Sequence, residues 1–210
     1  MTALNYLLTE NCVIISMDTL TSRDYKTPLK YSSKIYPLPH LNSVLCGTGS
    51  HSLIINWFSH IQGRILAKDI HGINEIAESE LPILNGEDKF DSDIYHFGYD
   101  IVTKKFVGYV FRESNKFKVE KLPYTMGIRP SKKEIVQNIA ENKYKSDPVL
   151  NFIELMKDQK KAEKLDGNIS SIGGEIHILV LREDEQTMWV SHRFDDYDSM
   201  YLKMLNKLNQ

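Results

Sequence analysis

The sequence predicts an α+β fold: a four-layer αββα sandwich in which two antiparallel sheets pack face to face and a helix pair covers each outer side. Two observations predict it. Apolar segments of strand length come in groups, and segments with helical periodicity come in pairs that fall between those groups. The 210 residues suffice for one sizeable core. No repeat, low-complexity tract or linker divides them, so we expect a single domain over 1–210.

The first half of the chain supplies one hairpin, two further strands and one helix pair. Two apolar runs flank a polar turn at 9–11, which is the pattern of a β-hairpin. The following segment is polar and contains Pro28, so we expect a loop there. The elements expected in order are strands 3–8 and 12–17, loop 19–33, strands 34–37 and 43–47, and helices 53–62 and 69–85.

The second half supplies a strand group, a helix pair and a final hairpin. Ser131 and Glu134 fit a capping box, so a helix is expected to begin after Ser131. The next helix carries its apolar residues on one face, and 157–164 is expected to be its solvated side. The remaining expected elements are strands 93–99, 104–112 and 116–122, helix 147–164, strands 174–182 and 187–193, and a helix from about 197.

Composition excludes several classes of function. The net charge is −2, with acids and bases interspersed, which gives no electrostatic basis for binding nucleic acid or an anionic membrane. No apolar run approaches a membrane span, and the N-terminus lacks a signal-peptide pattern, so we expect a cytoplasmic protein. Cys12 and Cys46 lie in or beside predicted strands, where free thiols are expected rather than a disulfide or a metal site. We expect no cofactor.

Thr2, Asp18 and Lys34 are the candidate catalytic residues, and they follow one another at two intervals of 16 residues. Met is commonly trimmed before a small residue, which would give Thr2 a free α-amine beside its own hydroxyl. That pair combines a nucleophile and a base, because an α-amine titrates near pH 8. A lysine nearby would lower the pKa of the amine, and an aspartate would hold the lysine charged and in place.

Taken singly, these residues have ordinary interpretations as well. An Asp often ends a strand as a turn residue, and a lysine such as Lys34 is often simply solvated. The joint spacing favours the catalytic interpretation, and so does a third element at 44–50, Val-Leu-Cys-Gly-Thr-Gly-Ser. This element predicts a strand that runs into a Gly-rich turn and then a helix, whose N-terminus would suit a developing negative charge.

At these residues the chain resembles the β-subunits of the proteasome and of the bacterial ATP-dependent two-component protease, which are N-terminal nucleophile (Ntn) hydrolases. The matching segments are Val-Ile-Ile-Ser-Met-Asp at 13–18, Ser-Lys-Ile-Tyr at 33–36 and the Gly-rich turn at 44–50. They occur in the family's order and at its spacing. The resemblance covers residues 2 to about 60, is weak through the middle, and returns in outline near 173–174.

The resemblance implies a role for each residue. Thr2 would attack an amide carbonyl, its α-amine would relay the proton to the leaving amine, and the chain would be a threonine peptidase or amidase. Lys34 would tune the amine and Asp18 would orient Lys34. The backbone N–H of Gly49, with Gly47 as the fallback, would face the oxyanion.

The resemblance also implies how a substrate would be held. Backbone groups of Ser22 and Gly49 would pair with an extended peptide, which is strand addition. The side chains of Thr21, Tyr36 and Cys46 would line the first specificity pocket, with Tyr36 making it medium-sized and mostly apolar. The expected partners are a peptide or unfolded protein and further copies of the chain in a ring.

Two departures from the family pattern concern accessory serines. The family usually places a serine directly before a glycine in the loop ahead of the penultimate hairpin. In this chain Ile172 separates Ser171 from Gly173, so Ser171 or Ser170 is the candidate, out of register. The second accessory serine lies in a Gly-Ser-Gly turn, for which Thr-Met-Gly at 125–127 is the nearest segment.

Two other functions therefore stay open. The chain could be a catalytically silent scaffold or binding subunit on the same fold, which the unmatched serines favour and the retained Thr2, Asp18 and Lys34 disfavour. It could also be an Ntn amidase for a small non-peptide amide, which would have a closed pocket rather than a shared chamber. The sequence does not reveal whether an unfolding ATPase is a partner, and it shows no hydrophobic docking tail at its C-terminus.

Overall fold

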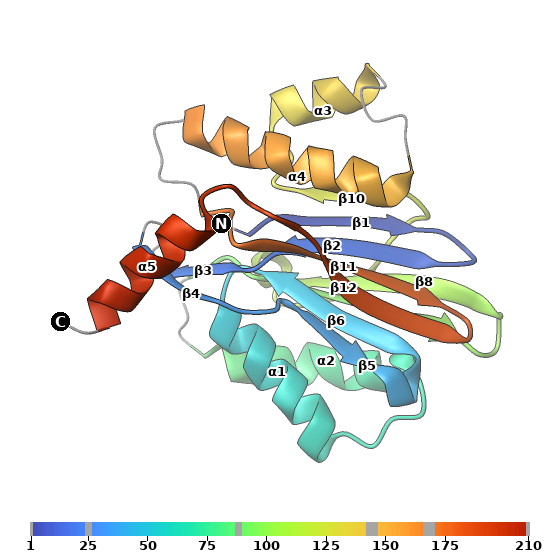
Figure 1. Ribbon diagram of the computed structural model, residues 1–210. Helices are drawn as coiled ribbons and strands as arrows, with labels where there is room; N and C mark the ends of the chain where they lie inside the picture. The colour runs from blue at the N-terminus through green and yellow to red at the C-terminus, as the bar shows by residue number, and fades with distance from the viewer. Residues whose placement is uncertain (1, 24–26, 87–89, 142–146, 166–170, 209–210) are drawn as a thin grey trace.

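The computed structural model describes residues 2–23, 27–86, 90–141, 147–165 and 171–208. Its layers run helix pair, sheet, sheet, helix pair, and Figure 1 shows α3 and α4 over one outer side and α1 and α2 over the other. The predicted four-layer αββα sandwich is confirmed. No helix in these described ranges has the length and apolar character that a membrane crossing requires.

Each sheet has five strands, and all pairings within the two sheets are antiparallel. The first sheet has the order β10 (Met126–Arg129), β1 (Leu4–Leu8), β2 (Val13–Asp18), β11 (Glu175–Arg182) and β12 (Glu185–Arg193), and it is covered by α3 (Lys133–Ala140) and α4 (Pro148–Leu165). The second has the order β5 (Ile35–Leu38), β6 (Ser43–Thr48), β7 (Asp93–Asp100), β8 (Lys105–Arg112) and β9 (Val119–Lys121), and it is covered by α1 (His51–Arg64) and α2 (Ile70–Asn85). Two 3-10 turns (Pro39–Leu41 and Glu113–Asn115) lie in its connections.

Three apolar cores fill the spaces between the four layers. Alternation along β2 assigns side chains to two of them, because neighbouring residues of a strand point to opposite faces. Val13, Ile15 and Met17 join the core between the sheets, whereas Ile14 packs toward α3 and α4. The third core joins the second sheet to α1 and α2 around the fully buried Trp57.

The segment predicted as a loop at 19–33 is instead largely a hairpin, so that prediction was wrong. Its strands β3 (Leu20–Arg23) and β4 (Thr27–Tyr31) form a separate two-stranded sheet. The pairing is irregular between Thr21 and Ser22, opposite Lys30 and Pro28. Proline has no N–H to donate, and the hairpin is mostly half-buried or exposed. It therefore shows none of the apolar alternation that marks a strand in the sequence.

Three smaller predictions also needed correction. β10 was not expected, and it pairs with β1 along the edge of the first sheet. In the segment 116–122 three residues form a strand, β9. Ser131 does not cap α3, because the N-cap is Lys132 and the cap makes no side-chain hydrogen bond. The C-terminal helix α5 (Tyr197–Leu208) packs against β4 and extends away from the sandwich in Figure 1.

The side of α4 that was expected to be solvated is partly buried. Gln159 and Glu163 are 0% and 4% exposed, and Lys160 is 7% exposed. The side-chain amide of Gln159 exchanges hydrogen bonds of 2.9 and 3.0 Å with the buried Asn5 amide of β1. The Gln159 amide also donates to the Arg129 carbonyl at 3.0 Å, so α4 ties β1 to the end of β10.

Candidate active site

Thr2, Asp18 and Lys34 lie together at one end of the sandwich, and the sheet register explains why. In the β1–β2 pair Leu4 is opposite Met17, so Ala3 lies beside Asp18, which ends β2, and Thr2 is the residue before Ala3. Lys34 directly precedes β5 of the other sheet. The three residues therefore come from three strand ends, which lie on rigid elements of both sheets.

The Asp18 carboxylate is fully buried and saturated with hydrogen bonds. Oδ1 accepts from the Ala3 N–H at 2.9 Å and from Lys34 Nζ at 3.0 Å, and Oδ2 accepts from the N–H groups of Leu20 and Gly173, each at 3.2 Å. A buried charge is costly unless it is paired and hydrogen-bonded, and this one is both. Asp18 thereby fixes the position of Lys34 and of the backbone that begins β1.

Lys34 is 4% exposed, and its ammonium donates to three oxygens. The distances are 2.7 Å to the Leu20 carbonyl, 3.0 Å to Asp18 Oδ1 and 3.3 Å to Thr2 Oγ1. Burial lowers the pKa of the Lys34 ammonium, and the charge and hydrogen bond of Asp18 oppose that shift. Lys34 thus places a fixed positive charge beside the Thr2 hydroxyl, with its proton more weakly held than on a solvated lysine.

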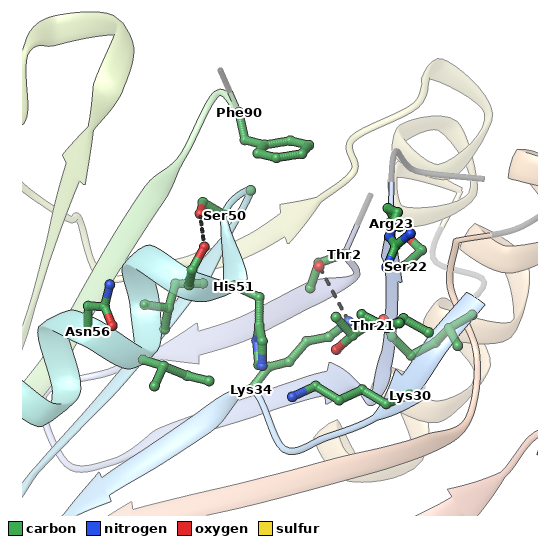
Figure 2. Close-up of a pocket in the computed structure, with 17 residues that line it drawn as sticks. Thr2, Thr21, Ser22, Arg23, Lys30, Lys34, Ser50, His51, Asn56 and Phe90 are labelled. Carbon is green, nitrogen blue, oxygen red and sulfur yellow. Dashed lines mark hydrogen bonds between the residues drawn. The ribbon is translucent and has the colours of Figure 1, made fainter. Parts of the chain in front are cut away.

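Two cavities meet at Thr2 and Gly49. The larger, of about 510 Å³, extends along β3 and the first turns of α1, and the smaller, of about 370 Å³, extends toward Asp93 and Arg129. Thr2 and Gly49 line both of them. The Thr2 hydroxyl in Figure 2 points into this region, with the dashed hydrogen bond to Lys34 beneath it. The candidate nucleophile therefore has open space on two sides.

Gly49 occupies a position that favours glycine. Its φ is +92°, and a Cβ atom built there would lie 2.6 Å from Ser92 Oγ. The next residue, Ser50, caps α1 by accepting a hydrogen bond from the Leu53 N–H at 3.3 Å. Among the described residues none accepts a hydrogen bond from the Gly49 N–H. This donor thus lies beside a helix N-terminus, at the mouth of both cavities.

Some of the other predicted site residues line the larger cavity and some do not. Thr21, Ser22 and the fallback Gly47 line the larger cavity. Tyr36 and Cys46, which were expected in the first specificity pocket, are not among the residues that line this cavity. Cys46 is 0% exposed in the core between the sheets, and Tyr36 packs on Phe58 of α1 with ring centroids 5.1 Å apart.

The accessory serines are not placed against Thr2 by any described contact. Ser171 is buried, and its hydroxyl donates to Glu163 Oε1 at 2.6 Å. Ser170 and Met1 lie outside the described residues. The segment compared with the Gly-Ser-Gly turn ends in β10, where Gly127 is opposite Tyr6 of β1.

Glu163 is a site residue that the sequence analysis missed. It accepts from the N–H groups of Ser171 and Ile172 at 2.9 and 3.2 Å as well as from the Ser171 hydroxyl. Its negative charge raises the pKa of Lys34, so it also acts electrostatically on the site. Helical periodicity could have found it, because Phe152, Met156 and Glu163 fall on one buried stripe of α4.

The described part of the chain contains no group of three or more His, Cys, Asp or Glu side chains arranged to hold a metal ion. Cys12 and Cys46 are free thiols, and burial raises the pKa of Cys46 far above its ordinary value.

No protein-family model matches the sequence, and neither does any curated protein. Among solved structures, a glycine-1 mutant of Anbu from Hyphomicrobium sp. strain MC1 matches with a TM-score of 0.65 and 11% sequence identity. The match covers 100% of this chain and 96% of that one. Anbu is a bacterial proteasome-like protein. The fold of this chain is proteasome-like. At this identity the likeness extends to the fold alone, so the proteasome-like fold and the Thr2 site are separate findings.

Proposed function

We propose that this protein is a threonine-type peptidase or amidase whose nucleophile is Thr2 after removal of Met1. The observation that carries the proposal is the position of Lys34 Nζ, 3.3 Å from Thr2 Oγ1 and 3.0 Å from Asp18 Oδ1, where two cavities meet. A hydroxyl, an ammonium and an orienting carboxylate in contact form the arrangement that an activated nucleophile requires.

The proposed reaction has two stages. Thr2 Oγ forms a bond to the substrate carbonyl carbon while its proton moves to the Thr2 α-amine, and the Gly49 N–H stabilises the oxyanion. The intermediate then breaks the C–N bond, and the α-amine passes the proton to the leaving amine. Water hydrolyses the resulting ester by the same route and restores the Thr2 hydroxyl. Lys34 lowers the pKa of the α-amine by like-charge repulsion, which adjusts the base to neutral pH.

An extended peptide is the substrate that the surroundings favour. β3 pairs with β4 along one edge, and no strand of the described chain pairs along its other edge, from Thr21 to Arg23. Such an edge can add a substrate strand through backbone hydrogen bonds. Space on both sides of Thr2 would allow the peptide to continue past the scissile bond. From the resemblance to proteasome β-subunits we further propose a ring of identical subunits that encloses peptides or unfolded protein.

Hydrolysis of fluorogenic peptide amides by protein of verified N-terminal mass tests the proposal. Trimmed wild-type protein should release the fluorophore, and Thr2→Ala should abolish release because the nucleophilic oxygen is gone. The matched control is Thr187→Ala, which removes an exposed hydroxyl on β12 that bonds Glu185 and should leave the rate unchanged. Equal rates in wild type and Thr2→Ala would contradict the proposal.

A silent scaffold is the second candidate function, and one observation favours it. The Ser171 hydroxyl donates to Glu163, and no described residue supplies an accessory hydroxyl in hydrogen-bond contact with Thr2. In this alternative Lys34 and Asp18 would serve to hold the strand ends together. A threonine-directed β-lactone separates the two functions, since a scaffold would form no adduct on Thr2 even after removal of Met1.

A further inference from the structure

The larger cavity beside Thr2 is lined by both apolar and positively charged side chains. Apolar carbon comes from Leu20, Leu29, Ile54, Ile55 and Phe90, and the cationic residues on the lining are Arg23, Lys30 and Lys34. No acidic side chain is among its described lining residues. A ligand that fills this space would therefore meet both apolar carbon and positive charge.

Two of the three positive charges have no compensating carboxylate in the described structure. Lys34 is paired with Asp18 at 3.0 Å, so that pair is close to neutral. Arg23 and Lys30 form no ion pair with a described carboxylate. The described lining therefore carries a net positive charge that a bound anion would neutralise.

His51 lines the same cavity and lies in the positive field of its lysines. Its pKa is lowered to about 4, first by burial and then by the charges of Lys30 and Lys34. Figure 2 shows the Lys30 side chain extending toward the His51 ring. Nε2 of that ring lies 3.5 Å from the Ser32 hydroxyl, which is 2.8 Å from the hydroxyl of Thr21. The neutral imidazole of His51 and the hydroxyls of Ser32 and Thr21 thus lie near the Lys30 ammonium. All four groups can donate hydrogen bonds.

We propose that this cavity selects substrates with a glutamate or aspartate on the acyl side of the scissile bond, with Lys30 as the main specificity-determining residue. The inference rests on the proposed peptidase function and assigns the substrate class of the same site. The short aliphatic stem of an acidic residue suits the Leu20 and Ile54 walls, and its carboxylate reaches Lys30 and His51. Tyr36, which was expected to make the pocket apolar and medium-sized, is absent from this lining.

Paired peptides that end in Glu, Gln or Lys before a fluorogenic amide test this selectivity. Glu and Gln have nearly the same shape, so their ratio isolates the charge. We expect kcat/KM to be about tenfold higher for the Glu peptide than for the Gln peptide at low salt, and the ratio to be smaller at high salt. The Lys peptide should have the lowest kcat/KM of the three. Lys30→Glu should reverse the order of Glu and Lys. Lys68→Glu, an exposed lysine outside both cavities, is the charge-matched control and should leave the order unchanged.

Binding of the same peptides to Thr2→Ala, measured by fluorescence anisotropy without the leaving group, separates recognition from catalysis. Preferential binding of Glu over Gln with no hydrolysis by any wild-type preparation would uphold the recognition proposal and contradict the peptidase. Hydrolysis with no preference for Glu, or with a preference that survives Lys30→Glu, would overturn the recognition proposal and leave the peptidase intact. Absence of both binding and hydrolysis would overturn both.

Discussion

The two helix layers cover their sheets in similar ways, but they bury different chemistry. Beneath α1 and α2 the core is apolar around Trp57, and the buried His96 lies between Trp57 and Asn74. Beneath α4 the core includes buried polar side chains, with Gln159 bonded to Asn5 and Glu163 bonded to the loop that reaches Asp18. The buried polar network under α4 thus connects to the residues that support the Thr2 site.

This difference indicates a division of roles. A buried polar network fixes specific atoms because each donor requires its acceptor, whereas apolar packing supplies stability with less directional constraint. Changes under α4 should therefore affect chemistry at Thr2 strongly, and changes under α1 and α2 should affect mainly the free energy of unfolding.

Lys34→Met should have the largest effect. It removes the ammonium beside Thr2 Oγ1 and leaves the buried Asp18 carboxylate without a counter-charge. We expect peptide hydrolysis to fall about a thousandfold or more, and the free energy of unfolding to fall by roughly 3–5 kcal/mol. Turnover assays and denaturant unfolding measure the two effects. Lys68→Met is the control, and a Lys34→Met protein with near wild-type turnover would contradict the site.

Acid should destabilise the α1–α2 side through His96. Burial lowers the pKa of His96 to about 3, and Nε2 accepts from the Trp57 indole N–H at 2.8 Å. As the pH falls below about 6.5 the unfolded chain gains a proton that folded His96 cannot take. The free energy of unfolding therefore decreases, by roughly 3 kcal/mol from this residue near pH 4.5. His96→Gln should remove that part of the pH dependence. Denaturant unfolding at a series of pH values measures it, and the same change of unfolding free energy with pH in wild type and His96→Gln would refute the prediction.

Glu163→Gln should impair the site more than the fold. The variant loses the charge that raises the pKa of Lys34 and one acceptor for Ser171, so we expect about a tenfold loss of turnover. As a positioning residue, Glu163 should also move the alkaline limb of the pH–rate profile to lower pH, because Lys34 then loses its proton more readily. Glu154→Gln, on the exposed face of the same helix, is the matched control. A profile that does not move would assign Glu163 a structural role alone.

Tyr36→Phe should have the smallest effect. The Tyr36 hydroxyl is buried and has no hydrogen-bond partner in the described structure, so its removal costs no bond. We expect the free energy of unfolding to stay equal or to rise by up to about 1 kcal/mol, and turnover to stay within about twofold. A clear change in peptide selectivity would return Tyr36 to the substrate cavity, from which the structure removes it.

The layers of the fold were predictable because apolar periodicity marks most of their elements. The hairpin β3–β4 was not, since its half-exposed residues and Pro28 lack that pattern. The expected meeting of Thr2, Asp18 and Lys34 came from a resemblance in spacing, and the sheet register explains it physically through the pairing of Leu4 with Met17.

The walls of the cavity were less predictable than the trio at its base. Tyr36 and Cys46 belong to neighbouring strands that point those side chains into cores, and the choice of face depends on sheet order that the sequence does not display. Lys30 and His51 enter the cavity from elements far from Thr2 in sequence, the first in the missed hairpin and the second at the start of α1. Glu163 was hidden because a charged run on a helix is usually solvated.

The most direct test of the central claim is mass-spectrometric mapping of a β-lactone adduct on two preparations of the protein. One begins at Thr2, and the other retains a leader residue that blocks the α-amine. We expect one adduct on Thr2 Oγ in the first preparation, none in the second, and none in a trimmed Lys34→Met variant. Equal labelling of the blocked and trimmed proteins, or labelling elsewhere with Thr2 unmodified, would contradict the central claim.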